Sequence, residues 1–332
     1  MIKSKNPSKP YIIDCFSYNG EKELLQIRLA VLNSHVDEFW VIWGEETYKG
    51  TPKERHEEPQ YSDFGKAAHK VKIIKVPRKK WLKNAWHREF YQNAYIGKYK
   101  KIWRSKKSNA YIFCSDLDEV WNPALKEELI SDCSRSLFGF IKLYLDNFNF
   151  YINYKCIRGK EEHISGPYLI RAGSMASYLT RTELRLIAQF KGHKIPHDYD
   201  PSGWHWSYVS RDEEFIRKKI AAFSHNEPHV ISAAKATAME RVAKHMGIIE
   251  DEEEYWSAVS LNNLNYEECD AEFIDLKDYI LPITQSTHET AEQLWRSGNS
   301  YASEPNRLNL LAYYRFAKKI IRCRVNSFGF ND

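Results

Sequence analysis

Short apolar runs separated by helix-like segments mark the first part of the chain. Four of these runs predict buried strands, at residues 11–16, 39–43, 71–76 and 111–114. Between the first two, residues 21–33 repeat leucine at helical spacing, and residues 86–99 predict an aromatic-rich helix before the fourth strand. Strands that alternate with helices favour an α/β fold with a mostly parallel sheet flanked by helices.

The pattern changes after Pro123, which opens a short predicted helix. Residues 137–145 and 148–154 alternate apolar with polar side chains on either side of Asp146-Asn147, which indicates a hairpin and therefore a mixed sheet. Further strands are expected at residues 168–171 and 204–209, and from Asp212 onward the chain is expected to be largely helical, with helices at residues 213–223 and 232–245.

Length and charge narrow the class of protein. The 332 residues are enough for a full core, and a net charge of +5 favours anionic partners without indicating nucleic-acid binding. Six cysteines lack metal-like spacing, which predicts reduced thiols. No run of 18 apolar residues occurs, so we expect a cytoplasmic protein. A basic amphipathic tail at residues 307–324 predicts either packing on the domain or peripheral contact with an anionic membrane.

Three carboxylates follow the fourth predicted strand: Asp116, Asp118 and Glu119. Ligands of open α/β sheets bind beyond the carboxyl ends of the strands, so these acids are expected to face a substrate. Their oxygens suit a hard divalent cation, which could hold a diphosphate. Capping of the helix after Pro123 is the structural alternative. The spacing alone is weak, because Asp198-Tyr199-Asp200 repeats it with no strand before it.

Two further segments carry candidate chemistry. Strand alternation at residues 202–208 would place Trp204 and Trp206 on one face and His205 on the other, where it would ligate a metal, bind phosphate or sit in the core. Residues 223–227 offer an imidazole and Glu227 at the end of a helix, either as chemistry or as a solvated helix end.

Five ordered motifs across about residues 10–228 resemble glycosyltransferase family 17, which includes the eukaryotic bisecting N-acetylglucosaminyltransferase. They are Asp14-Cys15-Phe16 with Asn19, residues 23–29, residues 36–39 with Glu45, residues 115–119, and residues 203–208. The sequence departs from the family at Val120-Trp121, with proline delayed to Pro123, which alters the expected shape of the donor lip.

The resemblance implies a GT-A fold, which is Rossmann-like, with residues 1–230 as the catalytic domain and residues 231–332 as a helical region packed on it. It also implies inverting transfer of N-acetylglucosamine from UDP-GlcNAc to a glycan hydroxyl, forming a β-linkage with Mn²⁺ or Mg²⁺. The implied metal ligands are Asp116, Asp118 and His205. The implied nucleotide-sugar contacts are Phe16, Asn19, Arg28, Glu45, Trp204 and Lys219.

Inversion requires a general base opposite the leaving group. We expect Glu227 in this role, with Asp200, Asp198 and Asp146 as rivals, and Glu119 orienting the sugar or tuning the acidic site. Two other functions stay open at this point: a phosphatase of the haloacid-dehalogenase type, whose nucleophile loop also follows an apolar strand, and a non-catalytic sugar-binding protein. A glycoside hydrolase is disfavoured, because its carboxylates must stand on opposite sides of the scissile bond.

Overall fold

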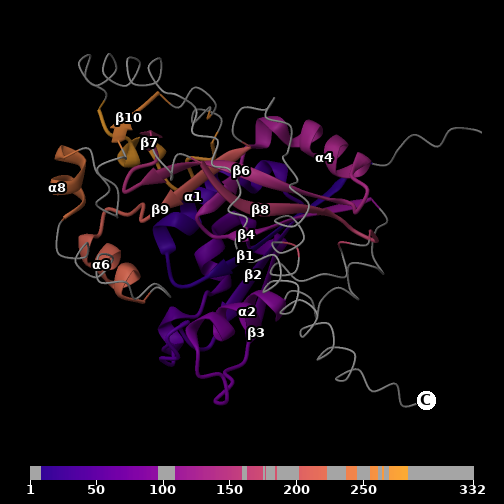
Figure 1. The fold of residues 1–332 in the computed structure, drawn as a ribbon, viewed down its shortest axis with the longest axis horizontal. Coiled ribbons are helices and arrows are strands. Elements are labelled where there is room, and N and C mark those ends of the chain that lie inside the picture. The colour runs from indigo at the N-terminus through magenta and orange to yellow at the C-terminus, as the bar shows by residue number, and fades with distance from the viewer. Residues whose placement is uncertain are drawn as a thin grey trace, which may run out of the picture.

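The computed structural model describes residues 9–95, 109–158, 163–174, 176, 184, 202–222, 237–244, 255–260, 264 and 269–282. In this part of the chain a single sheet of ten strands runs through the molecule, with helices packed against it (Figure 1). The α/β class with a mixed sheet is therefore confirmed.

Four parallel strands form one half of the sheet. They are β1 (Tyr11–Tyr18), β2 (Glu38–Gly44), β3 (Val71–Val76) and β4 (Ala110–Asp116), and they lie in the order β4-β1-β2-β3. Helix α1 (Lys22–Leu32) connects β1 to β2, and helix α2 (Ala85–Tyr95) precedes β4. The four strands predicted in this part of the chain are all found, and their carboxyl ends lie at one edge of the sheet.

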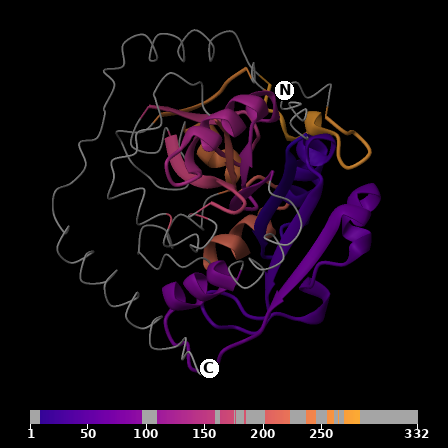
Figure 2. The ribbon, with the colours of Figure 1, turned by 90° about the vertical axis from the view of Figure 1, so that its right-hand side faces the viewer.

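The other half of the sheet is largely antiparallel. Its strands are β8 (His163–Arg171), β6 (Phe140–Asn149), β7 (Tyr154–Arg158) and β10 (Tyr255–Ala258), in that order outward from β4. Strand β9 (Gly203–Ser207) runs parallel to β6 and antiparallel to the short β5 (Glu119–Trp121). In Figure 2 the magenta elements lie beside the indigo and purple elements that come first in the chain.

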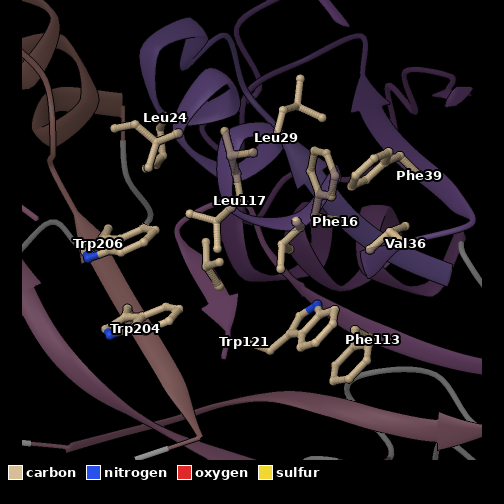
Figure 3. Packing of buried hydrophobic residues seen from close by; sticks show 14 of the residues in the cluster. Phe16, Leu24, Leu29, Val36, Phe39, Phe113, Leu117, Trp121, Trp204 and Trp206 are labelled. Carbon is tan, nitrogen blue, oxygen red and sulfur yellow. The ribbon is translucent and has the colours of Figure 1, made fainter. Parts of the chain in front are cut away.

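Both faces of the parallel half are buried, because alternate residues of each strand enter different cores. Phe16 of β1 packs with Leu29 of α1 in the larger core, which also takes in Trp204 and Trp206 of β9 (Figure 3). Cys15 packs on the opposite face, with the half-buried Tyr91 of α2 at its margin. Packing on both faces thus holds the parallel strands in place, and with them the residues at their carboxyl ends.

The predicted hairpin is found between β6 and β7, which pair antiparallel, but its turn does not lie at Asp146-Asn147. Strand β6 runs straight through both residues, and the chain turns only after Asn149, where Phe150 adopts a positive φ of 65°. Tertiary contacts explain the difference. Asp146 accepts an ion pair from Lys155 at 2.8 Å, so the polar side chain serves a buried contact rather than a turn.

Among the described residues after Asp212, one strand was not predicted. Helices α6 (Glu213–Ala222) and α8 (Ala238–Ala243) are present, but residues 255–258 form β10 at the edge of the sheet. The division at residue 230 stays a prediction, and the basic tail at residues 307–324 lies outside the described residues. None of the helices in the described part of the chain is long and apolar enough to cross a bilayer.

Candidate active site at the carboxyl edge of the sheet

The acidic loop begins where β4 ends. Asp116 is the last residue of β4 and lies in register with Ser17 of the neighbouring β1, whose hydroxyl donates to Asp116 Oδ1 at 2.7 Å. Asn122 caps the helical turn that follows, accepting a hydrogen bond from the backbone of Ala124. The cap therefore comes from Asn122, and the acids of the loop remain at the sheet edge.

Arg28 holds this loop from beneath. It is fully buried, and its guanidinium forms a bidentate pair with both carboxylate oxygens of Asp14 at 2.7 Å. The same guanidinium donates to the backbone oxygens of Asp116, Leu117 and Glu119 at 2.8 to 3.1 Å. A rigid fork of donors suits this task, because one side chain fixes three carbonyl groups of the same loop. Arg28 was expected to lie towards a nucleotide, and the structure places it under the acidic loop instead.

Glu119 also faces the loop. Its Oε2 accepts a hydrogen bond from the backbone amide of Asp116 at 2.7 Å, and its side chain is buried. Gly166 of β8 leaves the space for it, since a Cβ there would lie 2.5 Å from Glu119 Oε1. In this arrangement Glu119 fixes the turn between β4 and β5.

Strand β9 brings an imidazole to the acids. Trp204 and Trp206 stack in the core with ring centroids 5.3 Å apart, and His205 points the other way, as strand alternation predicts. His205 Nδ1 lies 3.0 Å from Asn147 Oδ1, and its Nε2 lies 3.9 Å from Asp118 Oδ1. The backbone amide of Trp206 donates to the carbonyl of Asp118 at 2.8 Å, which ties the acidic loop to β9.

Helix α6 contributes a buried cation. Lys219 Nζ lies 3.1 Å from Asp118 Oδ2 and 3.4 Å from Glu21 Oε1, and these three side chains are between 10% and 14% exposed. Glu21, which precedes α1, also accepts from the backbone amide of Asn19 at 2.9 Å. An ammonium thus sits between carboxylates from two different parts of the chain.

The pKa values reflect this pairing. Burial by itself would raise the pKa of Asp118, but the charge of Lys219 and the imidazole of His205 outweigh it, so the pKa lies below its ordinary value. Burial by itself would lower the pKa of Lys219, but Asp118 and Glu21 raise it well above its ordinary value. Both groups are therefore charged at neutral pH.

The donor set fits a divalent cation that arrives with a diphosphate. Among the described residues, no group of three or more His, Cys, Asp and Glu side chains is arranged to hold a metal ion. Mg²⁺, however, is commonly held by one or two carboxylates together with substrate phosphates and water. Asp116 and Asp118 supply such carboxylates, and Lys219 already stands beside Asp118 as a cation. A closed metal centre made by the described side chains alone is not what these residues build.

A cleft of about 510 Å³ opens at the carboxyl ends of β2 and β3, on the same edge of the sheet as the acidic loop. Its walls include Trp43, Glu45 and Lys53, and the size is that of a small-molecule site. Lys53 donates to Asn19 Oδ1 at 2.7 Å, which links the cleft to the end of β1. Burial lowers the pKa of Lys53 to about 8, although Glu21 and Glu57 act in the opposite direction.

The predicted site residues therefore have several positions. Asp116, Asp118, His205 and Lys219 come together, and Asn19 with Glu45 adjoins the cleft. Phe16 and Trp204 are core residues. Asp146 is paired with Lys155. Three candidate bases, Asp198, Asp200 and Glu227, lie outside the described residues and stay predictions.

Sequence reasoning missed Glu21, Lys53 and Asn147. Glu21 carries a weak local signal, because an acid just before a predicted helix often interacts with its N-terminus. Lys53 comes from a polar loop and carries no signal, since its burial depends on how residues 45–57 fold back on β2. Asn147 was assigned to a turn, and only its pairing with His205 across β6 and β9 reveals its position.

Comparisons with known proteins identify the family of the chain. The profile of glycosyltransferase family 17 matches residues 3–251, about three quarters of the chain. No curated protein matches. The chain is similar to the galactosyltransferase LgtC solved with donor and acceptor sugar analogues, with 11% identity, 84% of this chain and 99% of that chain covered, and a TM-score of 0.31. It is also similar to mouse xyloside xylosyltransferase 1, with 12% identity, 59% and 77% covered, and a TM-score of 0.24. Likeness at this level identifies neither a site nor a substrate.

Proposed function

Because the chain belongs to glycosyltransferase family 17, we propose that it transfers N-acetylglucosamine from UDP-GlcNAc to a hydroxyl of a glycan, with inversion and in a divalent-metal-dependent reaction. The family match favours transfer over the phosphatase and the non-catalytic sugar-binding protein. One observation carries the proposal: Asp116, Asp118, His205 and Lys219 converge beyond the carboxyl end of β4, and a cleft large enough for a nucleoside opens at the same sheet edge, beyond β2 and β3.

The charges suit a leaving diphosphate. Asp116 and Asp118 would hold the cation, which when bound supplies Lewis-acid stabilisation of the departing diphosphate. Lys219 adds a positive charge beside Asp118. Preorganised charges in a buried site act strongly because they need no rearrangement as negative charge develops. Arg28 and Glu119 are positioning residues, since they hold the backbone of the acidic loop.

The donor would span the sheet edge. Its diphosphate would lie over Asp118, and its nucleoside would extend across the end of β1 into the cleft near Trp43 and Lys53. An aromatic face and a cation suit a base and a ribose-phosphate. On the acceptor side, inversion requires a base opposite the diphosphate, and we propose Glu227, with Asp200 as the alternative.

The test is release of UDP from a panel of nucleotide sugars, measured with Mn²⁺ and with chelator, in the presence of glycan acceptors. UDP-GlcNAc with Mn²⁺ is expected to give the fastest release, and Asp118→Asn to abolish most of it. Asp278→Asn is the matched control, because Asp278 is an exposed carboxylate that pairs with Arg211. Equal release by wild type and Asp118→Asn would overturn the site, and a different preferred sugar would overturn the donor.

A further inference from the structure

Lys219 occupies the position on Asp118 that a divalent cation would need. Its Nζ lies 3.1 Å from Asp118 Oδ2, and its side chain is only 10% exposed. A second cation cannot approach the same buried carboxylate without strong repulsion from the ammonium, since little water is there to screen it. The two positive charges therefore compete for Asp118.

Neither the metal ion nor the diphosphate can displace Lys219 from Asp118 by itself. If Lys219 leaves without replacement, Asp118 loses its counter-charge in a site where unpaired charges are costly. A diphosphate without a metal ion would meet the carboxylates of Asp118 and Glu21, and a metal ion without diphosphate would meet Lys219. When both arrive together, Lys219 pairs with the diphosphate and Asp118 pairs with the metal, so every charge keeps a partner.

Glu21 keeps the movement of the Lys219 ammonium short when Lys219 leaves Asp118. Its carboxylate lies 3.4 Å from Lys219 Nζ and is fixed by the backbone amide of Asn19 at 2.9 Å. Lys219 can thus give up Asp118 while Glu21 still holds its ammonium beside the site. A lysine suits this role better than an arginine, because its ammonium is a point charge on a flexible stem.

We propose that Lys219 is a placeholder cation that couples the binding of the metal ion to that of the nucleotide diphosphate. It blocks Asp118 in the empty enzyme and moves to the diphosphate when the donor binds. This inference rests on the proposed function, and it adds an order to it: the metal ion binds weakly by itself and tightly with the nucleotide.

The test is the affinity for Mn²⁺ in solution, measured by electron paramagnetic resonance with and without UDP. For the wild type we expect UDP to tighten Mn²⁺ binding by about 5- to 150-fold, the usual size of coupling between sites. Lys219→Met is expected to bind Mn²⁺ more tightly than wild type when UDP is absent, and to lose most of the coupling. Lys218→Met is the matched control, because the neighbouring lysine is 73% exposed and pairs only weakly with Glu214 at 3.8 Å.

The outcomes separate the two proposals. Wild-type enzyme that binds Mn²⁺ equally well with and without UDP overturns the placeholder, and this measurement needs no variant that might misfold. Lys219→Met that folds, as judged by its circular dichroism, but binds Mn²⁺ no better than wild type also overturns it. Wild-type enzyme that binds neither UDP nor Mn²⁺ under any condition overturns the proposed function instead.

Discussion

Two buried ion pairs flank the acidic loop, and they differ in how firmly each cation is held. Arg28 and Asp14 are both fully buried, and the guanidinium makes six hydrogen bonds to Asp14, Ser115 and the loop backbone at 2.7 to 3.1 Å. Lys219 contacts Asp118 at 3.1 Å and Glu21 at 3.4 Å, and these side chains are 10% to 14% exposed.

The difference separates support from chemistry. The Arg28 guanidinium fixes the loop backbone through its hydrogen bonds, and replacing it would leave several buried acceptors without partners. A point charge with two alternative carboxylates can change partners at small cost. The same sheet edge therefore combines a rigid ion pair, Arg28 with Asp14, and an exchangeable one, Lys219 with Asp118.

The largest expected effect comes from breaking the rigid pair. Arg28→Met is predicted to reduce the free energy of unfolding by about 3–5 kcal/mol, because it leaves Asp14 as an unpaired buried charge. Urea denaturation followed by circular dichroism measures this. Arg135→Met is the control, since Arg135 is 73% exposed, and it should change stability very little. Equal stability of the two variants would contradict the supporting role of Arg28.

Breaking the exchangeable pair should affect activity more than stability. Asp118→Asn is predicted to lower kcat roughly 100- to 1000-fold, the cost of removing one preorganised charge-stabilising group. Its loss of stability should be smaller than that of Arg28→Met, because Glu21 still pairs with Lys219. Steady-state kinetics and urea denaturation of the same preparation measure both effects. A stability loss as large as that of Arg28→Met would remove the distinction between the pairs.

A methyl group added beside Glu119 tests whether the acidic loop needs its rigid support. Gly166→Ala would place a Cβ 2.5 Å from Glu119 Oε1, and Glu119 cannot yield freely because it holds the amide of Asp116. We predict a loss of about 1–3 kcal/mol, the usual cost of overpacking, together with reduced kcat. Thermal unfolding and kinetics measure the two. Unchanged kcat in a destabilised variant would show that Glu119 does not position Asp116 for catalysis.

The smallest expected effect is a pH dependence at the cleft. Lys53 has a pKa lowered to about 8, so it is charged below that pH and neutral above it. Donor affinity should fall as pH rises through 8, by about tenfold for the loss of one charged hydrogen bond of about 1.5 kcal/mol. Calorimetric titration with UDP between pH 7 and 9 measures this. Lys53→Met should bind weakly and without this pH dependence, and an unchanged profile in the variant would exclude Lys53 from the donor site.

Stability should respond to the same residue with the opposite sign. The pKa of Lys53 in the folded protein lies below that of an unfolded lysine, near 10.4. Between these values the unfolded chain binds more protons, so the contribution of Lys53 to stability increases with pH over that window. The gain is complete above the unfolded pKa, and the penalty is fully present below about pH 8.

Local pattern predicted the parallel half of the sheet because its signals are short-range. Strands β1 to β4 are apolar runs with polar ends, and Asp116 and Asp118 were found because they follow one of them. The turn of the β6–β7 hairpin was wrongly placed at Asp146-Asn147, because a local turn signal competes with tertiary contacts. Here Asp146 pairs with Lys155 and Asn147 contacts His205, so both residues stay in the strand. Strand β10 was missed because its partner β7 lies about a hundred residues earlier in the chain.

The site itself divides in the same way. The acids could be found from a strand end and His205 from strand alternation, whereas the family resemblance was needed to single out Lys219 among the lysines. The distances of His205 and Lys219 to Asp118 depend on β9 pairing with β5 and on Lys219 of α6 reaching Glu21 before α1, which no local pattern encodes. Lys53 and Glu21 needed the folded loop and the helix end to become visible.

The sequence distance between Asp118 and Lys219, 101 residues, has a consequence for synthesis. A nascent chain that has left the ribosome only as far as residue 200 already contains the strands β1 to β4 with their acids, but neither β9 nor α6. Long-range contacts of this kind form late in folding. The carboxylates therefore lack their cationic partner until residues 203–222 have been synthesised. The proposed site would be completed in one late step of folding.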